Sequence, residues 1–319
     1  MEAEVWGEVW AGAEAEAGAC VRAGACVRAG LWAAAAEWAE ASAGGDIEDR
    51  RGDERATNGE KHMKILVCGK GGCGKSTIVA LLAKELALRK RKVLVIDSDE
   101  SNIGLHTKLG MQKPEDFMNY FGGKRLLFEK TRELKDKWRL NDLPEDYLSE
   151  KGDIQLLSMG KIYEFGEGCA CPINALSSRF LEILDLGDEE FLIADTDAGI
   201  EHFGRGVEKG VDILLAVIDP SQESILLTKK VSQLGKQADK PVYYVLNRIA
   251  DRETEQFILN SIDREKVIAI IRENREISIS GLAGNELDMH VEGIKEIADL
   301  LESQKKARVK ATRMSEPAG

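Results

Sequence analysis

Residues 69–77, with the sequence GKGGCGKST, constrain the fold more than any other part of this 319-residue chain. They match the phosphate-loop pattern G-x-x-x-x-G-K-[ST] between an apolar run at 64–68 and helical spacing at 75–89, which is the context that the pattern requires. Glycines let backbone N–H groups point at phosphate oxygens, and the following helix N-terminus faces the same anion. We expect Lys75 to reach the β and γ phosphates of ATP or ADP and Ser76 to offer its hydroxyl to Mg²⁺. The other predicted loop residues are Gly69, Gly71, Gly72, Cys73, Gly74 and Thr77.

Apolar runs alternate with helix-like stretches after Met63. Further apolar runs lie at 92–97, 153–158, 191–195, 213–219, 242–247 and 267–271, and helical spacing lies at 175–186, 221–237, 253–262 and 291–301. The runs are continuously apolar, which is typical of strands buried on both faces. This alternation predicts an α/β fold, with a doubly wound, mostly parallel sheet, helices on both faces and ligand-binding loops at its carboxyl edge.

Carboxylates follow two of these apolar runs. Asp97 and Asp99 end the second run in VIDSDESN, and Asp195 ends the run FLIAD. Side chains at the carboxyl ends of parallel strands face the ligand crevice, so we expect Asp195 to hold Mg²⁺ through water. Gly199 follows in DTDAG, where its N–H can contact the γ-phosphate. An ordinary Asp-Ser-Asp turn is the alternative for the first pair.

Two cysteines form a C-x-C motif at Cys169 and Cys171, just before a helical stretch. Two thiolates are an incomplete metal site, since structural zinc takes four ligands. A symmetric homodimer would supply four thiolates around an ion on the two-fold axis. Soft thiolates suit both Ni²⁺ and Zn²⁺, so the residues do not choose between them. A redox-active or merely packed cysteine pair is the alternative.

Lys70 is not required by the general phosphate-loop pattern. The variant K-G-G-x-G-K-[ST] resembles the deviant Walker A loop of the MinD, ParA and nitrogenase-iron-protein class. That resemblance implies that Lys70 crosses a dimer interface to the partner's nucleotide, as an arginine finger does. It also implies that Asp99 orients the attacking water, that Asp97 assists Mg²⁺ hydration, and that Asn247, which ends VYYVLN, contacts adenine. Asn247 is otherwise an ordinary turn residue.

Three strings together narrow the resemblance. GKGGCGKST, GEGCACP and DTDAGIEHFGRG resemble the CO dehydrogenase maturation ATPases (CooC/AcsF type) over residues 63–301. The resemblance implies a homodimeric, ATP-hydrolysing nickel chaperone whose partner is the apo-enzyme of CO dehydrogenase or acetyl-CoA synthase. Asp197 departs from the pattern, because glutamate is commoner there in that family.

Two other functions compete with this one. An iron–sulfur ATPase reductase would need a cysteine close behind the Asp195 region, and residues 196–209 contain none. A MinD- or ParA-like positioning switch would need a membrane-binding amphipathic helix or a basic DNA-binding face. The basic tail at 304–319 offers few bulky apolar residues, which disfavours the membrane version. The acidic composition, with a net charge of -12, disfavours a basic DNA-binding face, so we expect neither membrane nor nucleic acid as a partner.

Residues 1–62 differ in kind from the rest of the chain. They are rich in Ala, Gly and Glu, and they repeat AGACVR without change at 17–22 and 23–28. We interpret them as a low-complexity extension outside the working protein, with the start at Met63; a genuine disordered or weakly helical extension is the alternative. They carry -7 of the net charge of -12, so the remaining -5 argues only weakly against nucleic acid.

The remaining chain is predicted to hold one ATPase domain at 63–303, with a helical insertion at about 111–152 and a basic, irregular tail at 304–319. No stretch of 18 uncharged apolar residues occurs, so no membrane-spanning helix is expected. Six cysteines, too few and too irregularly spaced for a disulfide framework, favour reduced thiols and a cytoplasmic location.

Overall fold

A computed structural model describes residues 62–315 except 124–125, 128–129, 132–133, 135–136, 163–170 and 199–206. Side chains are also left undescribed at 171, 207–208 and 309–315. All of these described residues belong to the unit Thr57–Gly319. None of the helices in this part of the chain is both long and apolar enough to cross a bilayer.

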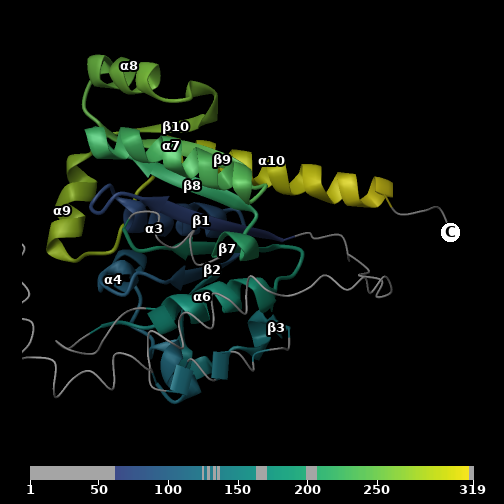
Figure 1. Cartoon of the computed structure of the whole chain (residues 1–319). Helices are drawn as coiled ribbons and strands as arrows, with labels where there is room; N and C mark the ends of the chain where they lie inside the picture. The colour runs from purple at the N-terminus through teal and green to yellow at the C-terminus, as the bar shows by residue number, and fades with distance from the viewer. Residues whose placement is uncertain are drawn as a thin grey trace, which may run out of the picture. The chain divides into compact units, whose positions relative to one another are not determined.

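The described residues form one eight-stranded sheet with the order β10-β9-β8-β1-β7-β2-β5-β4 (Figure 1). Every neighbouring pair is parallel except β4 and β5. The strands are β1 (Met63–Gly69), β2 (Lys92–Asp97), β4 (Leu148–Lys151), β5 (Ile154–Ser158), β7 (Glu190–Asp195), β8 (Ile213–Ile218), β9 (Val242–Ile249) and β10 (Val267–Arg272). The predicted mostly parallel, doubly wound sheet is confirmed, and each predicted strand lies within two residues of an observed one.

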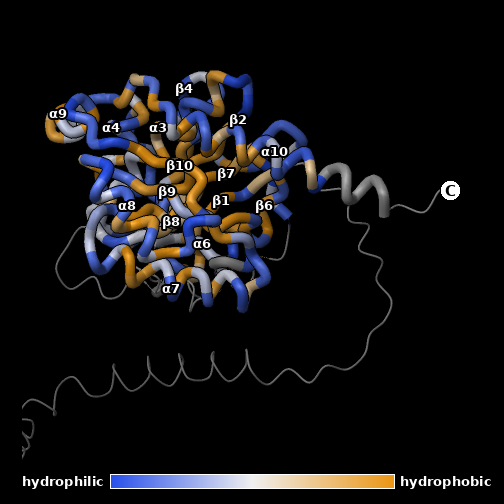
Figure 2. Tube along the Cα trace, turned by 90° about the horizontal axis from the view of Figure 1, so that it is seen from above, coloured by the Kyte–Doolittle hydropathy of each residue, from blue (hydrophilic) through white to orange (hydrophobic). Residues whose placement is uncertain are grey.

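Helices cover both faces of the sheet. They are α3 (Lys75–Leu88), α4 (Leu105–Leu109), α6 (Cys171–Ile183), α7 (Gln222–Gln237), α8 (Arg252–Ser261), α9 (Arg275–Ala283) and α10 (Glu292–Ser315). Strand side chains alternate between the faces, so Ile65 and Val67 of β1 pack with α3 and α10, whereas Leu66 and Cys68 join the core under α6 and α7. Figure 2 shows the hydrophobic strands enclosed by more polar segments.

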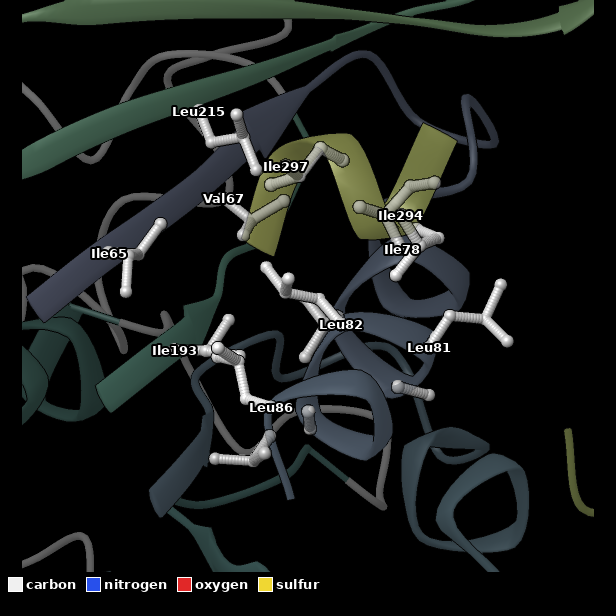
Figure 3. Packing of buried hydrophobic residues seen from close by; sticks show 14 of the residues in the cluster. Ile65, Val67, Ile78, Leu81, Leu82, Leu86, Ile193, Leu215, Ile294 and Ile297 are labelled. Atoms are coloured by element: carbon white, nitrogen blue, oxygen red, sulfur yellow. The ribbon is translucent and has the colours of Figure 1, made fainter. Parts of the chain in front are cut away.

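The core between α3, α10 and the sheet is formed by branched aliphatic residues (Figure 3). Leu82 and Leu86 of α3 and Ile297 of α10 are fully buried with Ile65 and Ile193 of the central strands. Because α3 begins directly after the phosphate loop, this packing fixes the direction of the helix whose N-terminus faces that loop.

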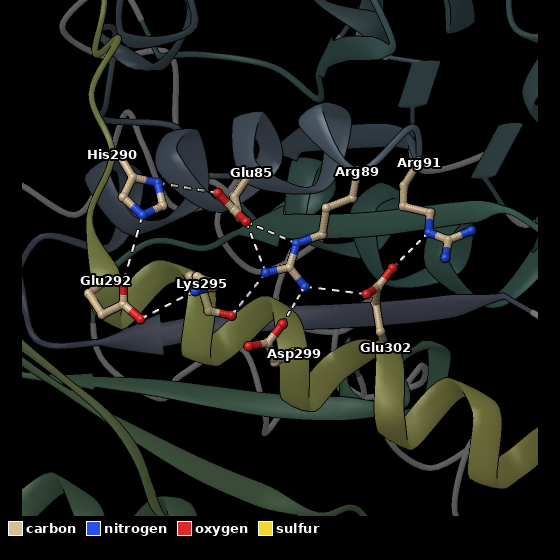
Figure 4. Close-up of polar contacts among 8 residues, drawn as sticks. All are labelled: Glu85, Arg89, Arg91, His290, Glu292, Lys295, Asp299 and Glu302. Atoms are coloured by element: carbon tan, nitrogen blue, oxygen red, sulfur yellow. Dashed lines mark hydrogen bonds and ion pairs between the residues drawn. The ribbon is translucent and has the colours of Figure 1, made fainter.

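Charged side chains also join α3 to α10 (Figure 4). Arg89 contacts Asp299 at 2.7 Å and Glu302 at 3.3 Å, and Arg91 donates to Glu302 at 2.8 Å. Arg89 and Glu302 are only 18% and 17% exposed, so these ion pairs are partly buried and add to the apolar contacts that hold α3 against α10.

The predicted irregular tail is wrong as far as Ser315, because α10 continues to that residue. Lys305, near the start of this stretch, packs against β7. The Lys305 ammonium lies 4.3 Å from the ring centroid of Phe191 and donates to the carbonyl of Glu190 at 3.4 Å. Burial lowers the pKa of Lys305 to about 8. A lysine side chain can cover apolar surface in this way, which the basic composition of the tail does not reveal.

The predicted helical insertion at 111–152 is helical only in part, with described α-helical residues at 126–127 and 130–131. Besides strand β4 it contains the short 3-10 turns η1 (Phe117–Phe121), η2 (Leu140–Asp142) and η3 (Glu145–Tyr147), and strand β3 (Trp138–Arg139), which pairs with β6 (Leu184–Asp185). Prolines at 114 and 144 and the Gly122-Gly123 pair interrupt helical hydrogen bonding. Aromatic contacts hold the segment instead, with Phe117 and Phe180 ring centroids 5.2 Å apart.

Candidate active site

The carboxyl ends of β1, β2 and β7 lie side by side and bring the predicted site residues together. Val67 of β1 and Asp97 of β2 both pair with Asp195 of β7 in the sheet register. The phosphate loop follows β1 directly and leads into α3. This edge is therefore where the topology places a ligand crevice.

The phosphate loop is braced from the end of β9. The amide of Asn247 donates to the carbonyl of Cys73 at 2.8 Å, and Arg248 donates to the carbonyl of Gly72 at 2.8 Å. The predicted adenine contact of Asn247 stays a prediction, but its amide N–H is already used to hold the loop. The sequence analysis did not identify Arg248, because Arg248 and its partner Gly72 are 176 residues apart in the sequence.

Lys75 is the first residue of α3, directly after the phosphate loop. Its side chain is buried, and no hydrogen bond or ion pair to its ammonium occurs within the described ranges. A buried charge without a partner is costly, so the ammonium is suited to meet the phosphates of a ligand. Cys73 is buried beside it, and burial raises the pKa of the Cys73 thiol to about 11, which leaves a packed, protonated side chain.

Asp195 and Asp97 form a buried pair of carboxyl groups. Burial together with the charge of Asp97 raises the pKa of Asp195 to about 7, against the opposing effects of Ser76 and Lys75. Burial likewise raises the pKa of Asp97 to about 6, with Lys161 opposing it. Both carboxylate oxygens of Asp195 and Oδ1 of Asp97 lack hydrogen-bond partners within the described part of the chain.

Those orphaned oxygens fit Mg²⁺, the cation that the fold family implies. Mg²⁺ prefers oxygen ligands, usually one or two carboxylates with water and phosphate. Asp195 and Ser76 offer such oxygens beside the loop, because the two groups are close enough for Ser76 to affect the pKa of Asp195. The donor set is therefore chemically suitable for the ion.

Asp99 organises the loop after β2. Its Oδ1 accepts hydrogen bonds from the backbone N–H of Ser101 at 3.0 Å and of Asn102 at 3.1 Å. Asn102 in turn donates to the hydroxyl of Ser76 at 2.6 Å. Oxygens of Asp99, Glu100 and Asp197 lie within 4.8 Å of one another. The role of Asp99 in orienting water stays a prediction, and its carboxylate already ties this loop toward Ser76 through Asn102.

Lys70 points toward the N-terminus of α7 within its own chain. Its ammonium donates to the hydroxyl of Ser221 at 3.2 Å and lies 3.3 Å from Glu223 and 3.9 Å from Asp219. Burial acts to raise the pKa of Asp219, but Ser221, Ser224 and Lys70 lower it below its ordinary value. Lys70 thus rests in an acidic cradle, which we define as Asp219, Ser221 and Glu223.

Three predicted site residues cannot be placed fully. Cys169 and Gly199 lie outside the described residues, and Cys171 is the first residue of α6 with an undescribed side chain. A residue that the sequence analysis missed is Lys161, whose ammonium lies 2.7 Å from Oδ2 of Asp97. Its position just after an apolar strand was a usable signal, since the same rule identified Asp97 and Asp195.

Replacing Gly74 with alanine is expected to weaken nucleotide binding at least about tenfold. Gly74 has φ +102°, and an added Cβ would lie 2.3 Å from Nδ2 of Asn247, the group that braces the loop. Such backbone strain costs roughly 1–3 kcal/mol. Titration with a fluorescent ADP analogue measures the loss. Gly72→Ala is the matched control, because Gly72 also has positive φ but nothing lies within 4 Å of its added Cβ; equal losses in the two variants would contradict the steric explanation.

Comparisons with known proteins agree with this geometry. The family model described as the CobQ/CobB/MinD/ParA nucleotide binding domain matches residues 64–287. An uncharacterised ATP-binding protein of Methanocaldococcus jannaschii is 50% identical over 248 residues, which cover 75% of this chain and 99% of that protein. The carbon monoxide dehydrogenase accessory protein CooC of Rhodospirillum rubrum is 31% identical over 231 residues, which cover 70% of this chain and 88% of that protein.

A solved structure shares the fold. The septum site-determining protein MinD of Pyrococcus horikoshii, complexed with Mg-ADP, superposes with a TM-score of 0.57 at 17% identity, covering 77% of this chain and 98% of that one. The phosphate loop, the buried carboxylates at the strand ends and the family match over 64–287 agree. The chain belongs to the CobQ/CobB/MinD/ParA nucleotide-binding domain family.

Proposed function

We propose that this protein hydrolyses ATP to load nickel into CO dehydrogenase or acetyl-CoA synthase, as a homodimer that carries the metal on Cys169 and Cys171 of both chains. The observation that carries the proposal is the position of this cysteine pair in the sequence. It follows Lys161, which contacts Asp97 at the strand ends, and its second member, Cys171, is the first residue of α6. The relative named as a carbon monoxide dehydrogenase accessory protein supports the choice of client.

The residues of the site have separate roles in the proposed hydrolysis. Lys75 neutralises the β and γ phosphates, and the loop N–H groups donate to their oxygens. Asp195 and Ser76 would hold Mg²⁺, which when bound neutralises charge on the transferred phosphoryl group. Asp99 orients the attacking water, and Lys70 of the partner subunit adds positive charge at the γ-phosphate.

Metal binding and hydrolysis are coupled in this proposal through the dimer. Four thiolates meet only when two chains close, and the same closure brings each Lys70 to the opposite nucleotide. Hydrolysis would loosen the closed dimer and so release the metal, which is the cargo of the reaction. Two sites that respond to one closure affect each other's affinity by an equal factor.

Replacing Cys169 and Cys171 together with alanine is expected to abolish nickel binding while leaving ADP affinity within about twofold of wild type. A site shared by two chains predicts about one half Ni²⁺ per chain, measurable by equilibrium dialysis and elemental analysis. Cys20→Ala/Cys26→Ala in the full 319-residue chain is the control, because it removes two cysteines that lie outside the predicted ATPase domain and should retain the metal. Unchanged nickel in the Cys169/Cys171 variant, or iron with sulfide in place of nickel in the wild type, would overturn the proposal.

A further inference from the structure

A fully buried lysine stands beside the carboxylate pair, outside every motif of the phosphate site. Lys161 is 1% exposed and follows β5 by three residues. Its ammonium contacts Oδ2 of Asp97 at 2.7 Å and donates to the backbone carbonyl of Asp99 at 2.5 Å. A buried ammonium persists only where it is paired and hydrogen-bonded, so these contacts are specific constraints on both partners.

The same stretch of chain contacts the loop after β2 at neighbouring positions. The backbone N–H of Met159 donates to the carbonyl of Asp97 at 3.0 Å, and that of Ile162 donates to the carbonyl of Glu100 at 3.3 Å. Lys161 lies between these two residues in the sequence, and its ammonium contacts the carboxylate of Asp97. Residues 159, 161 and 162 therefore hold Asp97, Asp99 and Glu100.

From that loop, hydrogen bonds continue to the phosphate-binding helix. The carboxylate of Asp99 accepts from the N–H of Asn102, and the amide of Asn102 donates to the hydroxyl of Ser76. Lys161 is thus two hydrogen-bonded residues away from a predicted Mg²⁺ ligand, without facing the phosphate loop itself.

We propose that Lys161 is a positioning residue for ATP hydrolysis, which holds the carboxylate of Asp97 and the backbone of Asp99 in the arrangement that the reaction requires. The inference rests on the hydrolytic part of the proposed function and is independent of nickel. Without Lys161, the carboxylate of Asp97 would lose its described ion-pair partner beside Asp195, whose two oxygens already lack partners in the described chain. Repulsion would then displace the loop that carries Asp99. Displacements of about 1 Å can slow an enzyme about 10²-fold.

Kinetics of the full chain test this role. Lys161→Met is expected to lower kcat for ATP about 10²-fold, with KM and ADP affinity within about threefold of wild type. Lys64→Met is the matched control: Lys64 is also buried, at 7% exposure, but its ammonium donates to the carbonyl of Leu181 in α6, so kcat should change less than about threefold. Equal kcat in wild type and Lys161→Met, or a parallel loss of kcat and nucleotide affinity, would overturn the inference.

Two further measurements keep the test decisive. If Lys161→Met does not fold, Asp97→Asn/Lys161→Met leaves no unpaired buried charge at this pair and should fold. Because Lys161 acts through Asp97, this double variant should be no more than about threefold slower than Asp97→Asn alone, whereas losses that multiply would contradict the role.

Hydrogen exchange of the nucleotide-free chain gives a readout that does not depend on activity. Peptides covering 97–104 should exchange at least about tenfold faster in Lys161→Met than in Lys64→Met. Unchanged exchange there would overturn the inference even if the protein proved to hydrolyse no ATP, and accelerated exchange would support it even if no nickel bound.

Discussion

Replacing Asp195 with asparagine is expected to slow ATP hydrolysis about 10²- to 10³-fold and, at neutral pH, to make the nucleotide-free protein more stable. Asp195 is 0% exposed, and neither of its carboxylate oxygens has a hydrogen-bond partner within the described chain. Burial and the charge of Asp97 raise its pKa from 3.8 to about 7. The ionised side chain is therefore held in the fold at a cost, which an amide of the same shape avoids.

The pH dependence follows from the direction of that shift. Between about pH 4 and pH 7 the folded state binds this proton more tightly than the unfolded state, so the free energy of unfolding falls as the pH rises. The cost is absent below the unfolded pKa and complete above the folded one. The stability gained by Asp195→Asn should consequently be small near pH 4 and reach on the order of 2–4 kcal/mol above pH 7.

Hydrolysis should change in the opposite direction. The carboxylate is the buried acid best suited to hold Mg²⁺ beside Ser76, and removing one preorganised electrostatic contact of this kind costs about 10²- to 10³-fold in kcat. A ligand that binds only the folded state stabilises the protein more when it binds more tightly. Mg²⁺ with ADP should therefore stabilise the wild type more than the variant, which lacks the carboxylate.

Urea unfolding at pH 5, 6, 7 and 8 and a phosphate-release assay measure the two effects. Asp153→Asn is the control, since Asp153 is exposed just before β5 and should alter neither quantity. A less stable Asp195→Asn protein at pH 8 would show that the carboxylate is stabilised within the fold, and the ligand-binding explanation of its unpaired oxygens would fail.

The local pattern of the sequence is sufficient to predict the sheet and the edge at which the site lies. Strands β1, β7 and β8 are buried on both faces, so each gives a continuous apolar run with no competing helical period. The rule that strand ends face the crevice then places Asp97 and Asp195 together, and the register pairs them directly.

Contacts between distant segments account for most of what the sequence did not predict. The ion pair of Lys161 with Asp97 and the hydrogen bond of Lys70 to Ser221, which spans 151 residues, depend on which loops the topology brings together. Helix α9 was also missed, because its residues are mostly exposed and show no apolar stripe. The spacing of apolar residues along the sequence does not reveal these contacts or an exposed helix.

Replacing Lys70 with alanine is expected to leave ADP affinity within about threefold of wild type and to lower ATP hydrolysis by at least about 10³-fold. In the described chain the ammonium of Lys70 contacts the acidic cradle of Asp219, Ser221 and Glu223. A positive charge supplied by a partner subunit at the γ-phosphate contributes about 10³- to 10⁵-fold to kcat.

The cradle must release Lys70 for that role. Its contact with Glu223 is a surface pair, because the Glu223 side chain is 76% exposed, and such pairs contribute at most about 1 kcal/mol. Glu223→Gln weakens the cradle but keeps the lysine, so its hydrolysis should equal or slightly exceed that of the wild type. A large loss in Glu223→Gln would indicate that the cradle itself serves the reaction.

Mixing Lys70→Ala with Asp195→Asn distinguishes action across the dimer from action within one chain. In a mixed dimer, the Lys70→Ala chain keeps its own Asp195 and receives Lys70 from the Asp195→Asn chain, so one of the two sites is complete. Random pairing makes half of the dimers mixed, each with one complete site, and activity should return to about one quarter of wild type per chain. If Lys70 acts on its own nucleotide, each chain lacks one essential group and the mixture stays inactive. Recovered activity therefore requires two chains at one nucleotide, because no rearrangement of a single chain can restore the missing side chain.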